Sequence, residues 1–294
     1  MSSTRAPSAE PDAIVAVPVR HWGRWLSGVV VVLLLVWLVW SAARSGFVDA
    51  SQVRHYLFSP LILQGLRATV VLAVLAQATG IVLGVVFAVM RLSKNAVAAW
   101  VAGAYIWFFR GTPVLVQLFF WYNGVPSIFK SIDVTVPFTH ATLYSARMVD
   151  FMTPFVAAFL GLALNEGAYM AEIVRAGISS VDQGQVEAAQ ALGMTPLLTM
   201  RRIVLPQAMR VIVPPTGNEF ISMLKTTSLA SAITYGELLR RSSDIYSTNL
   251  QVVPLLVVAS IWYLVLTTVA SGGQYLLERR FGQASPSSRR RRRR

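Results

Sequence analysis

The chain has 294 residues, of which 55% are hydrophobic and only 13% are charged, against roughly 25% charged in typical soluble domains. This balance predicts an integral membrane protein. Cysteine is absent, which excludes disulfides, thiolate catalysis and cysteine-ligated metals, and the three histidines lie too far apart in sequence to suggest a metal site. The net charge of +13 comes partly from the arginine run at 289–294, and the other basic residues lie mostly near the ends of apolar stretches, as in membrane proteins.

The first 43 residues predict a tail and one membrane span. Residues 1–24 are polar and proline-containing, and we expect a disordered cytoplasmic tail. Residues 25–43 carry no charge over 19 positions, close to the ~20 needed to cross the hydrocarbon core. A signal peptide cleaved near Ser41 and Ala43 is the alternative, although its apolar part would exceed the usual ~7–15 residues.

Five further apolar stretches follow in the rest of the chain. The second span is predicted at 68–90 after an external connection at 44–67, and the third at 95–123, broken near Gly111 and Pro113. An external loop at 124–149 precedes a fourth span that begins at Phe151. Pro206 opens a fifth span that is too polar to face lipid, so it belongs inside a bundle or at a dimer interface. The sixth runs over about 252–277.

The predicted fold class is therefore an all-α integral membrane protein, a polytopic helical bundle of about six transmembrane helices. Six spans place both termini on one side. The segments on that side hold more of the lysines and arginines than the opposite loops do, which favours a cytoplasmic location for both termini.

The polar segment between the fourth and fifth spans predicts a helix-turn-helix elbow. Asp182 or Ser180 can cap a short helix that runs through residue 192, and Gly193 suits the left-handed residue that ends it. Thr195 and Pro196 then have the character of the cap and first residue of a second short helix. An amphipathic helix lying on the lipid headgroups is the alternative.

This segment resembles the signature of permease subunits of bacterial ABC importers. The matching residues are Glu187, Ala188, Ala189, Gly193, Ile203, Leu205 and Pro206. The stretches 67–91, FRGTPVLVQLFFWY at 109–122, AEIVRAGI at 171–178, LPQAMR at 205–210 and LKTTSLASAI at 224–233 resemble the polar amino acid branch of that family. The resemblance covers about residues 62–278, whereas the first span and both charged tails depart from the five-helix core.

The resemblance implies a five-helix type I importer domain at 62–278, preceded by an extra helix at 25–43 and followed by a basic cytoplasmic tail at 279–294. It also implies a bacterial plasma membrane protein with three kinds of protein partner: cytoplasmic ATP-binding subunits docked on the elbow, an extracytoplasmic solute-binding protein, and a second permease copy, identical or paralogous. Lipid is the remaining partner, with the terminal arginines attracted to anionic headgroups. That run lacks the interleaved aromatics of nucleic-acid binders, so no nucleic acid is expected.

The chain is not expected to hydrolyse ATP or to bind a cofactor. A phosphate-cradling loop needs a Gly-Lys pair, whereas Lys94, Lys130 and Lys225 follow Ser93, Phe129 and Leu224. No catalytic residues are predicted, and ATP and Mg²⁺ would be bound by the partner ATPase.

Polar residues inside the predicted spans are candidates for the substrate pathway, because they are costly in a membrane. The candidates are Asn165, Glu166, Asn218, Glu219, Lys225 and Thr227. Glu166 could hold the ammonium of an amino acid, and Lys225 with the hydroxyls at 226–228 could meet its carboxylate. The alternative is that Glu219 and Lys225 pack or pair within the bundle.

Two other polar features are predicted to be structural. Arg110 is expected to satisfy carbonyls freed at the helix break, and Glu172 and Arg175 are expected to form a surface pair.

The predicted function is import of polar amino acids driven by ATP, with the 187–206 segment coupling the permease to the ATPase. A gradient-driven secondary amino acid transporter is one alternative, but it predicts an inverted repeat that the sequence does not show. An ABC permease for another small polar solute is the other.

Overall fold

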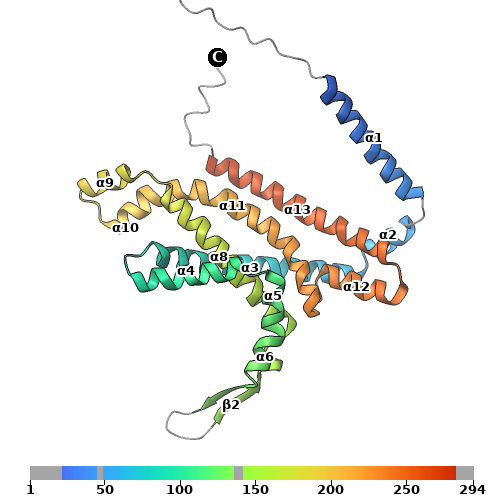
Figure 1. Cartoon of the computed structure of the whole chain (residues 1–294), viewed down its shortest axis with the longest axis horizontal. Helices are drawn as coiled ribbons and strands as arrows, with labels where there is room; N and C mark the ends of the chain where they lie inside the picture. Colours follow the sequence, from blue (N-terminus) through green and yellow to red (C-terminus); the bar gives the residue numbers. More distant parts are fainter. Residues whose placement is uncertain (1–21, 45–48, 136–141, 283–294) are drawn as a thin grey trace, which may run out of the picture. The chain divides into compact units, whose positions relative to one another are not determined.

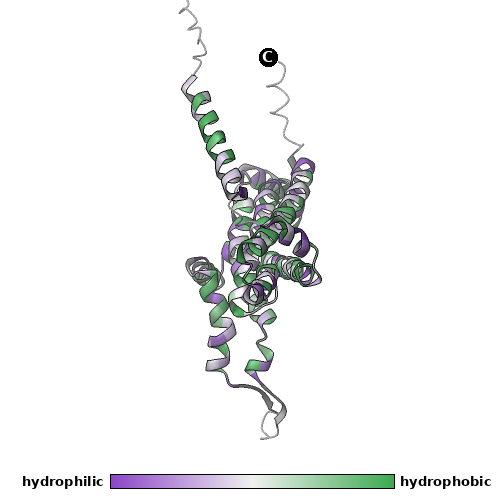
Figure 2. Cartoon of the chain, turned by 90° about the vertical axis from the view of Figure 1, so that its right-hand side faces the viewer, coloured by the Kyte–Doolittle hydropathy of each residue, from purple (hydrophilic) through white to green (hydrophobic). Residues whose placement is uncertain are grey.

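The computed structural model describes residues 22–44, 49–135 and 142–282. It divides into two units, Met1–Val48 and Asp49–Arg294. In the first unit, α1 (Trp22–Arg44) is a helix of 23 residues, about 35 Å long at 1.5 Å per residue. Figure 2 shows that its central turns are hydrophobic. The predicted span at 25–43 lies within this helix, whereas most of the predicted tails at 1–24 and 279–294 lies outside the described residues.

The second unit is built from helices and one short hairpin (Figure 1). Its first half contains α2 (Ala50–Leu57), α3 (Pro60–Leu92), α4 (Ala96–Gly111), α5 (Val114–Phe119), the π-helix η1 (Phe120–Gly124), α6 (Val125–Ile128), β1 (Ser131–Thr135) and β2 (Thr142–Arg147). Its second half contains α7 (Met148–Phe151), α8 (Pro154–Ser179), α9 (Gln183–Ala191), α10 (Pro196–Thr199), the π-helix η2 (Met200–Val204), α11 (Leu205–Thr226), the 3-10 helix η3 (Thr227–Ile233), α12 (Leu238–Asn249) and α13 (Val252–Gly282).

The helical bundle confirms the predicted fold class, and a short β-hairpin is added to it. Within the described ranges, two helices are long and apolar enough by themselves to cross a membrane, Pro60–Leu92 and Val252–Arg280. The helices α8 and α11 have 26 and 22 residues, but they carry the polar residues of the fourth and fifth predicted spans. The predicted external loop at 124–149 contains an antiparallel β1–β2 hairpin, in which Ser131 pairs with Arg147.

The second predicted span begins earlier than expected. We expected it at 68–90, but α3 starts at Pro60, where Ser59 accepts a hydrogen bond from the Ile62 amide at 3.4 Å. A side-chain cap followed by proline at the first helical position is a strong start signal, and it extends the helix over residues that have a mixed composition.

The third predicted span is interrupted where the sequence indicated. The helix α4 ends at Gly111, and α5 begins after Pro113, whose backbone is extended. Gln117 bridges the break, because its Nε2 donates to the carbonyls of Phe109 (3.0 Å) and Thr112 (3.1 Å). The prediction that Arg110 satisfies these carbonyls is therefore wrong, since an amide one turn into the next helix does so.

The most extensive helix–helix contact joins α3 to α8. A Cβ placed on Gly80 would collide with the side chain of Glu166, and one on Gly84 would collide with Met170. The absence of side chains at these two positions therefore allows the two helices to approach closely, and it brings the polar middle of α8 against α3.

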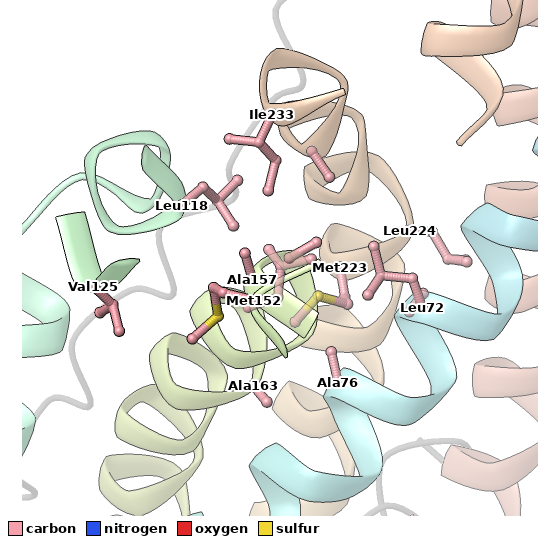
Figure 3. Packing of buried hydrophobic residues seen from close by; sticks show 14 residues of the cluster. Leu72, Ala76, Leu118, Val125, Met152, Ala157, Ala163, Met223, Leu224 and Ile233 are labelled. Carbon is pink, nitrogen blue, oxygen red and sulfur yellow. The ribbon is translucent and has the colours of Figure 1, made fainter. Parts of the chain in front are cut away.

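Most of the buried apolar residues described in the second unit form three clusters. The largest contains residues of α3, α5, α8, α11 and η3, and Figure 3 shows Leu72, Leu118, Ala157, Met223 and Ile233 converging between these elements. A second cluster contains Ala88, Met170, Val174, Ala208 and Ile212. The third joins Ile62, Leu238, Leu255, Val258 and Ala259. Figure 1 shows α12 and the α9–α10 pair at opposite ends of the bundle.

Glu237 joins α12 to α13 at one end of the bundle, next to a hydrogen bond between α12 and α3. Its side chain is fully buried and caps α12 by accepting from the amides of Leu239 (2.9 Å) and Arg240 (2.7 Å). The hydroxyl of Tyr263 on α13 donates to the same carboxylate at 2.7 Å. On α3, Thr69 accepts from the Leu238 amide at 3.1 Å.

We predict that Glu237→Ala lowers the free energy of unfolding by about 2 kcal/mol or more, because a helix cap is lost and the hydroxyl of the half-buried Tyr263 loses its acceptor. The matched control is Asp150→Ala, which removes an ion pair with Arg147 whose side chains are 58% and 75% exposed. That change should stay within about 0.5 kcal/mol. Unfolding of the purified protein in detergent measures both, and equal losses would contradict the role of Glu237.

Candidate functional site: a polar pocket and an exposed elbow

A pocket of about 330 Å³ lies between α5, α8 and α11. It is lined by Val114, Leu162, Asn165, Glu166, Tyr169, Glu219, Ser222, Met223 and Thr226. Two of these residues are carboxylates, and none of them is a lysine or an arginine. The lining therefore offers acceptors to a positively charged group.

Each of the two long helices contributes one stripe to this pocket. On α8 the stripe is Leu162, Asn165, Glu166 and Tyr169, and on α11 it is Glu219, Ser222, Met223 and Thr226. Both follow the spacing i, i+3, i+4, i+7, which places four side chains on one face of a helix. The pocket is therefore a property of two regular helices that face each other.

Glu166 is the most buried acid of the pocket, with 4% of its surface exposed. Its Oε1 accepts a hydrogen bond from Nε2 of Gln77 on α3 at 3.0 Å. Its aliphatic part lies against Gly80, where a Cβ would collide with it. Glu219 lies close enough to repel the Glu166 carboxylate electrostatically, and Arg110 on α4 lies close enough to attract the Glu219 carboxylate.

Asn165 connects the pocket to the break between α4 and α5. Its Nδ2 donates to the Phe109 carbonyl at 2.7 Å. Arg110, the residue after Phe109, places its guanidinium over the ring of Tyr169, 5.1 Å from the ring centroid. Tyr169 lines the pocket, so Arg110 brings a cation to the pocket's edge from a helix that does not line it.

The structure separates the predicted pathway residues into two groups. Asn165, Glu166 and Glu219 line the pocket. Asn218 instead accepts from Nε2 of Gln274 on α13 at 3.1 Å, on another face of α11. No ion pair joins Glu219 to Lys225 in the ranges described.

Two further candidates lie away from the pocket. Lys225 lines a different hollow of about 310 Å³, together with Ser228, Ser260, Tyr263, Leu264 and Thr267. Thr227 is fully buried, and its hydroxyl donates to the Leu224 carbonyl at 2.8 Å. Sequence reasoning did not select Tyr169 or Ser222, although both follow from the helical spacing. The predicted pair of Glu172 and Arg175 is confirmed at 2.8 Å.

The elbow between α8 and α11 has the predicted local geometry in its first arm. Asp182 caps α9 by accepting from the Gly184 amide at 2.9 Å. Gly193 has a φ of +76°, the left-handed conformation that ends such a helix. Thr195 then caps α10, with its hydroxyl oxygen accepting from the Leu198 amide at 3.4 Å.

The second arm of the elbow differs from the prediction. We expected a separate short helix and a restart at Pro206, but α10, η2 and α11 follow one another without a break in helical backbone. The Leu205 amide donates to the Met200 carbonyl five residues back, which makes this a π-turn. A π-turn next to Pro206 accommodates a residue that has no amide hydrogen, so the helix widens and continues.

The elbow is held to the bundle on one side and exposed on the other. Gln207 Nε2 donates to Gln185 Oε1 at 2.6 Å, which links α11 to α9, and Ala189 is buried with 3% exposure. Glu187, Ala188, Gly193, Leu205 and Pro206 are exposed, whereas Ile203 is half-buried. Leu192 and Leu197 are 83% and 79% exposed. Sequence reasoning missed these two leucines, although large apolar residues in a segment outside the spans are a signal for a binding surface.

Among the described residues, no group of three or more histidine, aspartate or glutamate side chains could hold a metal ion. The side chains gathered in the pocket therefore offer charge and hydrogen bonds to a ligand. The elbow exposes two large apolar side chains, Leu192 and Leu197.

Comparison with known proteins gives a consistent result. The sequence profile of the family described as "Binding-protein-dependent transport system inner membrane component" matches residues 80–283. The arginine transport system permease protein ArgU of Corynebacterium glutamicum is 48% identical over 95% of this chain and 87% of its own length. The L-cystine transport system permease protein TcyB of Bacillus subtilis is 38% identical over 76% of this chain and 87% of its own.

A solved structure agrees with these relatives. A crystal structure of an amino acid ABC transporter with histidines superposes with a TM-score of 0.66 at 38% identity, and it covers 79% of this chain and 99% of the other. The profile, the relatives and the solved structure together identify the chain as a member of the family of inner-membrane components of binding-protein-dependent transport systems, in the branch of amino acid ABC permeases.

Proposed function

We propose that this chain forms the translocation path of an ATP-driven importer and that its pocket takes an amino acid with a cationic side chain. The observation that carries the proposal is the pair Glu166 and Glu219, two carboxylates in a pocket whose lining contains no lysine or arginine. The pocket's volume of about 330 Å³ suits an amino acid with a long side chain.

The arrangement gives each part of such a substrate a partner. The two carboxylates meet the side-chain cation and the α-ammonium, and charge-assisted hydrogen bonds of this kind are about twice as strong as neutral ones. Arg110 at the edge of the pocket is the cation placed to meet the substrate carboxylate, and Thr226 adds a hydroxyl. This replaces the expected role of Lys225, which lines another hollow. The relative named as an arginine permease and the transporter solved with histidines support the same substrate class.

The elbow is proposed to dock on a separate cytoplasmic ATPase. With six spans, both termini would then lie on the same, cytoplasmic side. The second arm continues through η2 into α11, the helix that carries Glu219 and its neighbours into the pocket. A displacement of the elbow by the ATPase is therefore transmitted to the pocket wall along one continuous helix. A solute-binding protein delivers the substrate from the other side, and a second permease copy completes the path.

Vesicle uptake tests the energy source. We predict that vesicles holding this permease, its ATPase and its binding protein accumulate labelled arginine only when ATP is supplied to the ATPase side. Uptake that persists without ATP would indicate the gradient-driven alternative. ATP-dependent uptake of a different class of polar solute, with none of arginine, would keep the importer and remove the substrate class.

Removing one carboxylate tests the substrate class. We predict that Glu219→Gln reduces the preference of the purified complex for arginine over its neutral isostere citrulline by about ten-fold or more, because one hydrogen bond to a charged group is lost. Competition binding with labelled arginine measures it. The matched control is Asn218→Ala on the adjacent position, which lies off the pocket and should keep the preference. A wild-type protein that binds citrulline as tightly as arginine would refute the cationic substrate.

Exposed leucines test the docking surface. We predict that the double variant Leu192→Glu and Leu197→Glu weakens association with the ATPase by about 100-fold or more, since burying each leucine in an interface contributes about 1.5 kcal/mol or more. Glu187→Lys should also weaken it. The matched control is Leu250→Glu, which is equally exposed at 84% but lies between α12 and α13. Co-purification measures association, and unchanged recovery of the ATPase with the double variant would show that the elbow is not the docking site.

A further inference from the structure

Gln77 lies behind the substrate pocket and contacts its most buried acid. It is on α3, is 95% buried, and does not line the pocket; it lines a larger apolar cavity of about 810 Å³ with residues such as Ile81, Met170 and Val174. Its Nε2 donates to Oε1 of Glu166 at 3.0 Å. Gln77 therefore lies between the polar pocket that contains Glu166 and the larger apolar cavity.

The two ends of the Gln77 amide are in different situations. The donor nitrogen has the Glu166 carboxylate as its partner, whereas the Oε1 acceptor is buried without a hydrogen-bond partner. Buried polar atoms are nearly always paired, and an unpaired one destabilises a fold. An apolar side chain of similar size would fill this position without that cost. The hydrogen bond that Nε2 donates to Glu166 is therefore the feature that distinguishes glutamine here.

The surface of α3 around Gln77 is shaped to receive Glu166. Gly80 lies one turn further along the same face, and a Cβ there would collide with the Glu166 side chain. The glycine leaves the space, and the amide supplies the hydrogen bond. Glu166 is thereby held against α3 although Glu219 repels it from within the pocket.

We propose that Gln77 is a positioning residue for substrate selection. It binds Oε1 of Glu166 and so leaves the other carboxylate oxygen, Oε2, oriented for the cationic end of the substrate. The inference rests on the proposed function, because it assigns to Gln77 the preference for a cationic over a neutral side chain. Without the Gln77 donor, Glu166 is free to rotate away from Glu219, and the two acids no longer act on one cation.

The test is Gln77→Met, which keeps the length of the side chain and removes its amide. We expect the preference for arginine over citrulline to fall by about ten-fold, the size associated with one hydrogen bond to a charged group, while citrulline binding stays within about two-fold. The purified permease–ATPase complex and competition with labelled arginine provide the measurement. Equal weakening of both ligands would show a merely structural role, and an unchanged preference would remove Gln77 from selection.

A double variant shows whether Gln77 acts through Glu166. In the Glu166→Gln background the donor of Gln77 no longer faces a charge, so adding Gln77→Met should change the arginine preference by less than about two-fold. If the two substitutions instead reduce the preference independently, Gln77 acts elsewhere and the proposal is overturned.

Gln117 provides a matched control. It is also 95% buried, its Oε1 is also unpartnered, and its Nε2 donates to the carbonyls of Phe109 and Thr112 at the helix break. Gln117→Met should weaken arginine and citrulline alike, because it loosens backbone without changing an acid. If Gln117→Met instead weakened arginine binding more than citrulline binding, the role in substrate selection would not be specific to Gln77.

The outcomes separate this inference from the proposed function. A wild-type complex that shows no preference for arginine over citrulline refutes the cationic substrate itself. A wild-type preference that survives Gln77→Met refutes only the role of Gln77.

Discussion

The close approach of α3 to α8 is the constraint on which the pocket depends. It requires glycine at positions 80 and 84, since a Cβ at either would collide with Glu166 or Met170. A carboxylate on a membrane helix is costly unless it faces a cavity or a partner. The glycines give Glu166 both, because its side chain packs on α3, reaches Gln77, and still lines the pocket on the α11 side. The packing of α3 on α8 therefore determines where the Glu166 carboxylate lies, in addition to stabilising the bundle.

The helix α11 connects the pocket to the elbow, and the π-turn η2 makes this connection possible. Pro206 has no amide hydrogen, so a standard helix would lose a hydrogen bond there and kink. The bond from Leu205 to the carbonyl five residues back widens the turn instead, and the helical backbone continues from Pro196 to Thr226. A motion of the elbow is consequently a motion of the helix that carries Glu219. π-Turns inside α-helices are frequent at functional sites.

Much of the architecture could be predicted from local sequence, and the exceptions have identifiable causes. The break after Gly111, the caps at Asp182 and Thr195 and the left-handed Gly193 depend on near neighbours, so residue type was enough. The predicted pathway residues do not all line one pocket, and helical geometry explains the separation. Thr226 is seven residues after Glu219 and shares its face, whereas Lys225, six residues after it, lies about 240° round the helix and points elsewhere. Gln77 was overlooked as one polar residue in an apolar run, and only the packing of α3 on α8 reveals its partner.

The charge balance of the pocket links recognition to transport in the proposed mechanism. Glu166 and Glu219 stand on different helices and repel one another, and Arg110 at the edge of the pocket attracts Glu219. A cationic substrate between them replaces this repulsion by two attractions and so favours a closer arrangement of α8 and α11. The elbow acts on α11 from its other end, and a force applied there changes the same separation. Substrate charge and ATPase docking therefore both act on the distance between Glu166 and Glu219. A neutral ligand of equal size would fill the pocket without changing that distance.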